Sequence, residues 1–371
     1  MVKKCLYLAG GGARGAYQAG VLKAMSVILR TEKLPFEMIS GVSVGSLNAA
    51  ILAEYAHDFP LAVEKLEEIW GNIHCEHVFE ASNYALSKSI FRNVLNIAFK
   101  QQHTGYLLNN APLVKFISRH VDFNLINSNI EKKHLEIMEV VTHCYETEQT
   151  ISFYHSHPDV DVEDWHYPRH LSQQARIILE HILASSSLPL FFPTTRLNGL
   201  HFGDGSIGLV SPLRGAIRFH MEKVLILGTR HPPLIANPEE FQKQDSIGFA
   251  SVLGSMLNGL FLDNLDRDIE LVNHMNDIAR LLSLWKKRRA PWRPISTLYL
   301  RPSVDISSWA QQRYHHLPIL LRTFLNGLGA GENGGDLLSF LLFEKNFARE
   351  LIQLGYQDTL AREEEVKAFF L

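Results

Sequence analysis

The sequence predicts an α/β fold with three layers, in which a mostly parallel central sheet lies between two layers of helices. Short apolar runs alternate along the chain with longer segments of helical periodicity, and this alternation is typical of parallel sheets. Two turns that lead from a strand into a helix are rich in glycine, at residues 10–15 (GGGARG) and 41–45 (GVSVG). Both turns lie at the strand-to-helix junctions that this fold class repeats.

The first half of the chain is expected to supply most of the sheet. Apolar runs predict strands at 5–9, 36–39, 135–142, 150–155 and 200–203, and those at 135–142 and 150–155 could form a hairpin around Glu146. Helices are expected at 16–30, 44–57, 60–70, 112–120 and 172–184. In the first of them, Ala16, Ala19 and Gly20 are small enough to let the helix lie close to the sheet.

The second half is expected to be mainly helical. Its clearest buried strand is 223–228, and amphipathic helices over 246–284 and a strand at 295–300 follow. A glycine-rich loop at 327–335 would lead into a helix from 336 to 354, closed by Gly355 as a C-cap. We therefore divide the chain into a first domain at 1–230 and a mainly helical C-terminal extension at 231–371, which contributes the strand near 295–300.

The composition is that of an ordinary soluble globular protein, with 46% hydrophobic and 20% charged residues among 371. A formal net charge of −3 gives no field that would attract nucleic acid, so no nucleic-acid partner is expected. The three cysteines are scattered and do not predict a disulfide framework. No signal peptide or apolar stretch of membrane-spanning length is visible. A cytoplasmic location follows, with at most peripheral contact to membranes.

The two glycine-rich turns carry the chemistry. Gly41-Val42-Ser43-Val44-Gly45 has the G-x-S-x-G pattern of a nucleophile elbow, a turn that pushes a serine hydroxyl out of the sheet, so Ser43 is the candidate nucleophile. The other turn offers free backbone N–H groups to an oxyanion. We expect this oxyanion hole to use Gly10, Gly11, Gly12 and Val44. Together the turns predict acyl transfer or ester hydrolysis.

A dinucleotide site is the alternative interpretation of the first turn, because it also satisfies G-x-G-x-x-G. That fingerprint requires an acidic residue at the end of the second strand, where this chain has Ser43. The acidic stretch at 158–170 lacks the glycine and closing glutamate of a calcium loop, and the cluster at 74–77 (HCEH) lacks a second pair of ligands. We therefore expect neither a cofactor nor a metal.

A serine hydroxyl is a weak nucleophile and needs a positioned base. Asp204 is the preferred candidate, because it follows the apolar strand at 200–203 and Gly205 beside it permits a tight turn. His201 and His231 are alternatives that would form a conventional triad. In a strand, however, His201 and Asp204 would point to opposite faces. Capping of a turn is the other role that Asp204 could have.

Four motifs in this order and spacing resemble those of the patatin-like phospholipases: 10–15, 41–45, 185–189 and 204–205. The chain looks like a bacterial-type member over roughly 4–230. The resemblance implies a patatin-like catalytic domain at 1–230 and a Ser43–Asp204 dyad that hydrolyses fatty-acyl esters of lipids, phospholipids included. Arg14 would support the glycine loop with Gly15, or contact a lipid phosphate. One departure is Ser206, where the family usually has glycine or alanine.

Two other functions stay open at this point. An acyltransferase could use the same acyl-serine and would favour a role for His201, and a lipid-binding protein could carry a degenerate site. The lipid ester is the expected partner in each case. Peripheral membrane contact is expected near Trp285 to Trp292, because the segment 285–293 combines two tryptophans with five cations. A solvated helix end is the alternative interpretation of that segment. The sequence does not predict the oligomeric state.

Overall fold

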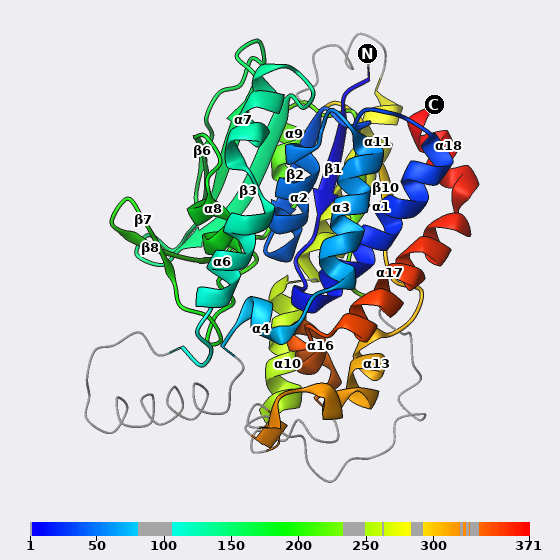
Figure 1. The fold of residues 1–371 in the computed structure, drawn as a ribbon. Coiled ribbons are helices and arrows are strands. Elements are labelled where there is room, and N and C mark those ends of the chain that lie inside the picture. Colours follow the sequence, from blue (N-terminus) through cyan, green and yellow to red (C-terminus); the bar gives the residue numbers. More distant parts are fainter. Residues whose placement is uncertain are drawn as a thin grey trace.

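A single sheet forms the centre of the protein (Figure 1). The computed structural model describes residues 2–80, 106–232, 249–261, 263–282, 292–319, 322–323, 326 and 334–371. Within these ranges the sheet has ten strands, and five neighbouring strands are parallel. In spatial order the five are β10 (Ser296–Leu300), β9 (Lys223–Leu227), β1 (Lys4–Leu8), β2 (Met38–Val42) and β3 (Ile137–Cys144).

Beyond β3 the sheet becomes mixed. The strand β4 (Gln149–Ser156) pairs antiparallel with β3, so the predicted hairpin is confirmed. β6 (His170–Gln174) and β5 (His166–Tyr167) continue this edge. A second hairpin, β7 (Thr195–Leu197) with β8 (Leu200–Asp204), joins the sheet where β8 pairs with the end of β3. The predicted mostly parallel sheet is therefore confirmed.

Helices cover both faces of the sheet, which confirms the three layers. Side chains of β1 alternate between two cores: Leu6 and Leu8 enter one, and Cys5 and Tyr7 the other. The first core is covered by α1 (Ala16–Leu29), α2 (Val44–Glu54), α3 (Phe59–Gly71) and α17 (Lys345–Leu360). The second is covered by α9 (Arg214–Arg218) and α11 (Asp263–Leu281). The other described α-helices are α4 (Cys75–Val78), α6 (Ala111–His120), α7 (Phe123–Glu131), α8 (Leu179–Ser185), α10 (Phe249–Phe261), α13 (Ile306–Gln312), α16 (Gly335–Leu341) and α18 (Glu363–Phe370).

Helices α1 and α17 cross in close contact, and two glycines permit it. A Cβ atom on Gly20 would collide with the backbone of Ile352, and one on Gly355 would collide with the carbonyl oxygen of Tyr17. Two expectations are thereby corrected. Gly20 lets α1 approach a second helix rather than the sheet, and Gly355 lies inside α17, which continues to Leu360, rather than at a C-cap.

Two predicted helices also differ from the structure. The expected helix at 336–354 is divided into α16 and α17, because Glu344 accepts hydrogen bonds from the N–H groups of Asn346 and Phe347 and so begins a new helix. The expected helix at 172–184 is strand β6 followed by the shorter α8. β6 forms by pairing with β4, a contact that local periodicity does not reveal.

Several expectations concern the C-terminal half. The strand near 295–300 is confirmed as β10, and the amphipathic helices over 246–284 as α10 and α11. The division at residue 230 stays a prediction. Residues 285–291 of the predicted membrane-contact segment lie outside the described residues. Trp292 is described, and its indole donates to the Asn276 side chain at 3.3 Å. Most of the glycine-rich loop at 327–335 also lies outside them.

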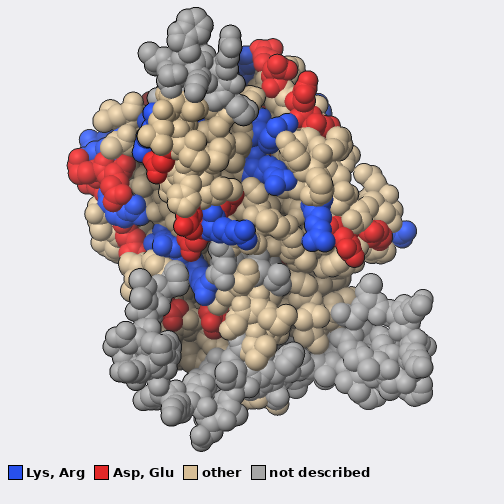
Figure 2. Space-filling model, turned by 180° about the vertical axis from the view of Figure 1, so that it is seen from behind, with Lys and Arg blue, Asp and Glu red and all other residues tan. Residues whose placement is uncertain are grey.

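Charge is mixed over the face that Figure 2 draws. Figure 2 shows lysine and arginine interspersed with aspartate and glutamate over the described part of the rear face. Among the described helices, none has the length and apolar character that crossing a bilayer requires.

Candidate active site

Ser43 lies at the sharp turn between β2 and α2. Its backbone has φ 54° and ψ −130°, an unusual conformation for a residue with a side chain, and strain of this kind is typical of nucleophile elbows. The flanking glycines let the turn close. A Cβ on Gly41 would meet the carbonyl oxygen of Gly45 at 2.5 Å, and one on Gly45 would collide with the carbonyl oxygen of Leu8. The local fold therefore has the elbow geometry that the sequence predicted.

Asp204 ends strand β8, and its side chain is fully buried. Burial raises the pKa of the carboxyl group to about 6, while interactions with the hydroxyls of Ser43 and Ser206 and the N–H of Ser206 act in the opposite direction. The Ser43 hydroxyl is thus close enough to stabilise the carboxylate. Oδ2 nevertheless has no protein partner in full hydrogen-bond geometry. Two residues far apart in the sequence therefore lie close together, and their action as a dyad stays a prediction.

The serines at the end of α8 and just beyond it hold both residues in place. The N–H of Ser43 donates to Ser185 Oγ at 2.9 Å, and Ser185 Oγ donates to the carbonyl oxygen of Val141 at 2.6 Å. The N–H of Asp204 donates to the carbonyl oxygen of Ser187 at 3.0 Å. The sequence analysis included these serines in a motif but assigned them no role. Their signal was the serine run at 185–187 ahead of Pro189.

The glycine loop lies beside Ser43. The place where a Cβ on Gly10 would stand is 3.1 Å from Ser43 Cβ. Gly11 has a φ of 150°, and a Cβ there would collide with Thr229. Gly12 has a φ of 56°, and a Cβ there would collide with the backbone of Phe340. The 3₁₀ helix η1 begins at Gly12 and α2 begins at Val44. The first N–H groups of a helix have no acceptor within it, so both starts offer free donors.

Arg14 points away from the cavity beside Ser43 and into the C-terminal part of the chain. Its Nε donates to Ser339 Oγ at 2.8 Å, its Nη2 lies 3.2 Å from Asp336 Oδ1, and its guanidinium stacks 4.5 Å from the Phe340 ring centre. Burial lowers the pKa of Arg14 to about 10, so it stays charged at neutral pH. Of the two predicted roles, these contacts match loop support.

Gly15 and a buried polar network complete the support of the loop. A Cβ on Gly15 would collide with the side chains of Val44 and Trp70. The Asn48 amide donates to the carbonyl oxygen of Gly15 at 3.2 Å and accepts from the Trp70 indole at 2.8 Å. Gln18 accepts from Asn48 and donates to the carbonyl oxygen of Ala9 at 2.9 Å. Sequence reasoning missed this network, since its members lie on three helices.

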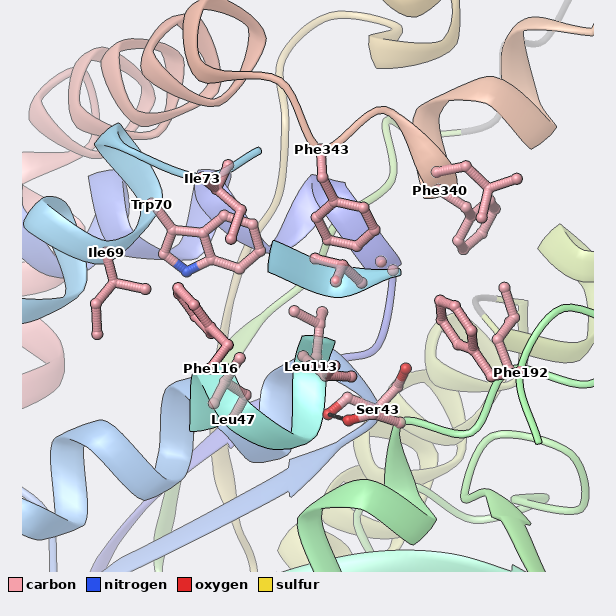
Figure 3. A pocket seen from close by; sticks show the side chains of 17 residues that line it. Ser43, Leu47, Ile69, Trp70, Ile73, Leu113, Phe116, Phe192, Phe340 and Phe343 are labelled. Carbon is pink, nitrogen blue, oxygen red and sulfur yellow. Dashed lines mark hydrogen bonds between the residues drawn. The ribbon is translucent and has the colours of Figure 1, made fainter. Parts of the chain in front are cut away.

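An apolar cavity opens beside Ser43. In Figure 3, Ser43 lies at one side with Leu113 and Phe192 nearby, and Ile69, Trp70 and Phe116 lie toward the other end. Phe340 and Phe343 enter from the C-terminal segment. The lining is Gly11, Gly12, Ser43, Val44, Leu47, Ile69, Trp70, Ile73, Val78, Leu113, Phe116, Ser186, Leu188, Phe192, Phe340, Leu341 and Phe343.

The histidine alternatives do not reach this site. His201 lies at the surface, where its Nδ1 is 2.6 Å from Glu146 Oε1, and neither His201 nor His231 lines the cavity beside Ser43. The histidine that an acyltransferase would favour is therefore paired elsewhere. Among the described residues, no group of three or more metal-ligating side chains is placed to hold an ion.

The fold and the site together define a class: an α/β protein with a serine at a nucleophile elbow, a glycine loop beside it and an apolar cavity next to both. The family model of the patatin-like phospholipases matches residues 6–217. The chain belongs to the patatin-like phospholipase family, and this membership supports lipid hydrolase activity.

Similarity to individual proteins is more limited. A patatin-like phospholipase domain-containing protein of Caenorhabditis elegans is 43% identical over 67 residues, which are 18% of this chain and 4% of that protein's length. VipD from Legionella pneumophila is 13% identical, with 95% of this chain and 67% of that chain covered and a TM-score of 0.36. Human GIVD cytosolic phospholipase A2 is 11% identical, with 100% of this chain and 63% of that chain covered and a TM-score of 0.35. The family assignment therefore rests on the family model.

Proposed function

We propose that this protein is a serine acyl hydrolase that cleaves fatty-acyl esters of lipids, phospholipids included, with Ser43 as nucleophile and Asp204 as base. The observation that carries the proposal is the meeting of three features: a strained serine at the elbow, a fully buried carboxyl group beside it and an apolar cavity next to both. A carboxylate held in an apolar site keeps enough basicity to accept a serine proton directly.

The first half-reaction acylates the serine. Asp204 accepts the hydroxyl proton of Ser43 while Oγ attacks the carbonyl carbon of the ester. The N–H groups of Gly11 and Gly12, with those of Gly10 and Val44, receive the negative charge that develops on the carbonyl oxygen. One such donor is worth about 3 kcal/mol in related acyl transfers. The ester bond then breaks, and the proton on Asp204 passes to the oxygen of the leaving alcohol.

The second half-reaction releases the fatty acid. Asp204, ionised again, accepts a proton from a water molecule that attacks the acyl-serine carbonyl. The same backbone donors stabilise the second oxyanion. Ser43 Oγ leaves and recovers the proton from Asp204, which restores the starting state.

The cavity supports a long acyl chain as the group transferred. Its lining is apolar apart from Ser43, Ser186 and the two glycines, so an alkyl chain would bury its surface there, at about 0.8 kcal/mol for each CH₂ group. The partner is therefore a lipid ester. We keep peripheral membrane contact near 285–292 as part of the proposal, on sequence grounds alone.

A panel of esters tests the proposal. Phospholipid, lysophospholipid, neutral glyceride and short-chain nitrophenyl ester are offered to the wild type, to Ser43→Ala and to Asp204→Asn. Ser118→Ala is the matched control, because this hydroxyl lies on the exposed face of α6 and donates only to its own helix. Both site variants should lose turnover while remaining folded, and the control should not. A substantial residual rate in Ser43→Ala would rule out Ser43 as the nucleophile.

A further inference from the structure

Ser206 carries a second hydroxyl into the site, at the position where the sequence departs from the family pattern. The residue is 2% exposed and follows Asp204 in the tight turn at the end of β8. Its N–H donates to Asp204 Oδ1 at 3.0 Å, so the turn folds back over the carboxyl group. The side chain of Ser206 is thereby fixed next to Asp204.

The hydroxyl points toward the reacting groups. Ser206 Oγ lies 3.1 Å from the place where a Cβ on Gly10 would stand, and Ser43 Cβ lies 3.1 Å from the same point. Ser206 Oγ and Asp204 Oδ2 are both buried, and neither has a protein partner in full hydrogen-bond geometry. Buried polar groups are rarely left without a partner. The Ser206 hydroxyl can donate and the Asp204 carboxylate oxygen can accept, so each group can serve as the other's partner.

We propose that Ser206 is a positioning residue for the base: its hydroxyl donates a hydrogen bond to the Asp204 carboxylate, orients it toward Ser43 and keeps it ionised at a lower pH than the same site would allow without the hydroxyl. The inference rests on the proposed function, because it assigns Ser206 a role in the action of Asp204. It requires no change of fold, because the Ser206 N–H already bonds to the other carboxylate oxygen, Asp204 Oδ1, at 3.0 Å.

The groups around Asp204 determine how much the Ser206 hydroxyl can stabilise its charge. Ser43 faces the carboxyl group from the elbow, and the Tyr145 hydroxyl lies over Gly203 next to it. Burial raises the pKa of Tyr145, and the charge on Asp204 raises it further, so that group is neutral near pH 7. Burial lowers the pKa of His143, which pairs with Gly203 on the neighbouring strand β3, so that it is neutral as well. Within the described ranges no cation pairs with Asp204, and hydroxyl and N–H donors therefore stabilise its charge.

The sign of the expected effect follows from the preferred protonation state. A donated hydrogen bond favours the ionised carboxylate, so losing it raises the pKa of Asp204, and the base is then protonated up to a higher pH. The acid limb of the pH–rate profile should move to higher pH by about 0.5–1 unit in Ser206→Ala, the effect expected for one hydrogen bond of typical net strength. Below the limb this corresponds to a loss of roughly 3- to 10-fold in kcat/KM.

The experiment measures kcat/KM from pH 4.5 to pH 9 with a short-chain nitrophenyl ester, for the wild type and for Ser206→Ala, Ser206→Gly and Ser206→Thr. The rate of Ser43 labelling by a fluorophosphonate over the same pH range reports the first step alone. The Ala and Gly variants should show the acid limb at higher pH in both measurements. Their rates on the plateau at high pH should stay within a few-fold of the wild type. Thr, which keeps the hydroxyl, should restore the position of the limb if the variant folds.

Two outcomes overturn the inference. An acid limb at the same pH in the wild type and in the Ala and Gly variants would show that the hydroxyl does not act on the base. A uniform fall at every pH would show a structural role only. These results differ from failure of the proposed function, which would appear as retained turnover in Ser43→Ala and Asp204→Asn. Thermal unfolding of each variant shows whether the fold is kept, and Gly replaces Ala if the Ala variant does not fold.

Discussion

Arg14 Nε donates a 2.8 Å hydrogen bond to Ser339 Oγ, and so joins the glycine loop to a helix 325 residues later in the chain. The same helix, α16, places the carbonyl of Phe340 against Gly12 and lines the cavity with Phe340 and Leu341. The family match ends at residue 217. Residues beyond the family-matched segment therefore form part of the wall beside Ser43.

The contact predicts that Arg14→Lys lowers activity through the glycine loop. Lysine cannot reach Ser339 and Asp336 with the planar fork that arginine uses. We expect kcat to fall about tenfold with KM little changed, because a displaced loop weakens donors that act mainly in the transition state. Arg349→Lys is the matched control, since Arg349 binds the carbonyl oxygen of Gly71 away from the loop. Equal effects of the two substitutions on kcat would contradict the assignment.

Gly12→Ala tests the loop itself. Its φ of 56° and the backbone of Phe340 leave no room for a methyl group, so the loop must move. Steady-state kinetics should show a fall in kcat of about 100-fold or more, the usual cost of losing one oxyanion donor. Gly199→Ala is a suitable comparison, because Gly199 also has a positive φ, 85°, but lies in an open turn with no neighbour in reach. That variant should keep its activity, and a Gly12→Ala enzyme that matched it would argue against the oxyanion role.

Asp204→Asn should raise stability at pH 8. Burial raises the pKa of Asp204 from 3.8 to about 6, so the folded protein binds more protons than the unfolded chain between these values. The contribution of Asp204 to the free energy of unfolding therefore falls as pH rises through this window. The difference between the pKa values of 3.8 and about 6 corresponds to about 3 kcal/mol. Thermal unfolding of both proteins should show a gain for Asn at pH 8 that becomes small near pH 4, and a loss at both pH values would contradict the burial argument.

Phe116→Ala should change the preference for acyl chain length. Phe116 and Ile69 line both the apolar cavity and a neighbouring polar groove between α3, α6 and α7, so they form the wall between the two. Removing the ring opens the cavity toward the groove, and longer acyl esters should gain in kcat/KM relative to short ones. Phe123→Ala is the control, because Phe123 lines the groove alone. An unchanged order of chain lengths in Phe116→Ala would show that the cavity does not hold the acyl chain.

The sequence was most informative where the signal is local. The elbow at Ser43 and the glycine loop are set by residues that are neighbours in the chain, and both turns lie where they were predicted. Strand β1 and strand β2 follow from short apolar runs in the same way. The proposed pairing of Asp204 with Ser43 follows from the sequence because Asp204 ends one strand of the sheet and Ser43 directly follows another.

Contacts between distant segments could not be read from the sequence. β6 was expected to be helical, because its pairing with β4 is absent from local periodicity. The position of Gly355 depends on the crossing of α17 with α1. The same holds for the bonds from Ser185 and Ser187 and for the clamp of α16 on Arg14, each of which requires the folded sheet to bring its partners together.

The most direct test of the central claim is the site and rate of covalent labelling by a fluorophosphonate, read by mass spectrometry of the peptide that contains residues 41–45. Our account predicts one adduct, on Ser43, formed at least 100-fold more slowly in Asp204→Asn at pH 8, because the base that removes the hydroxyl proton is gone. Labelling of a different serine, or equal rates in the two proteins, would contradict it.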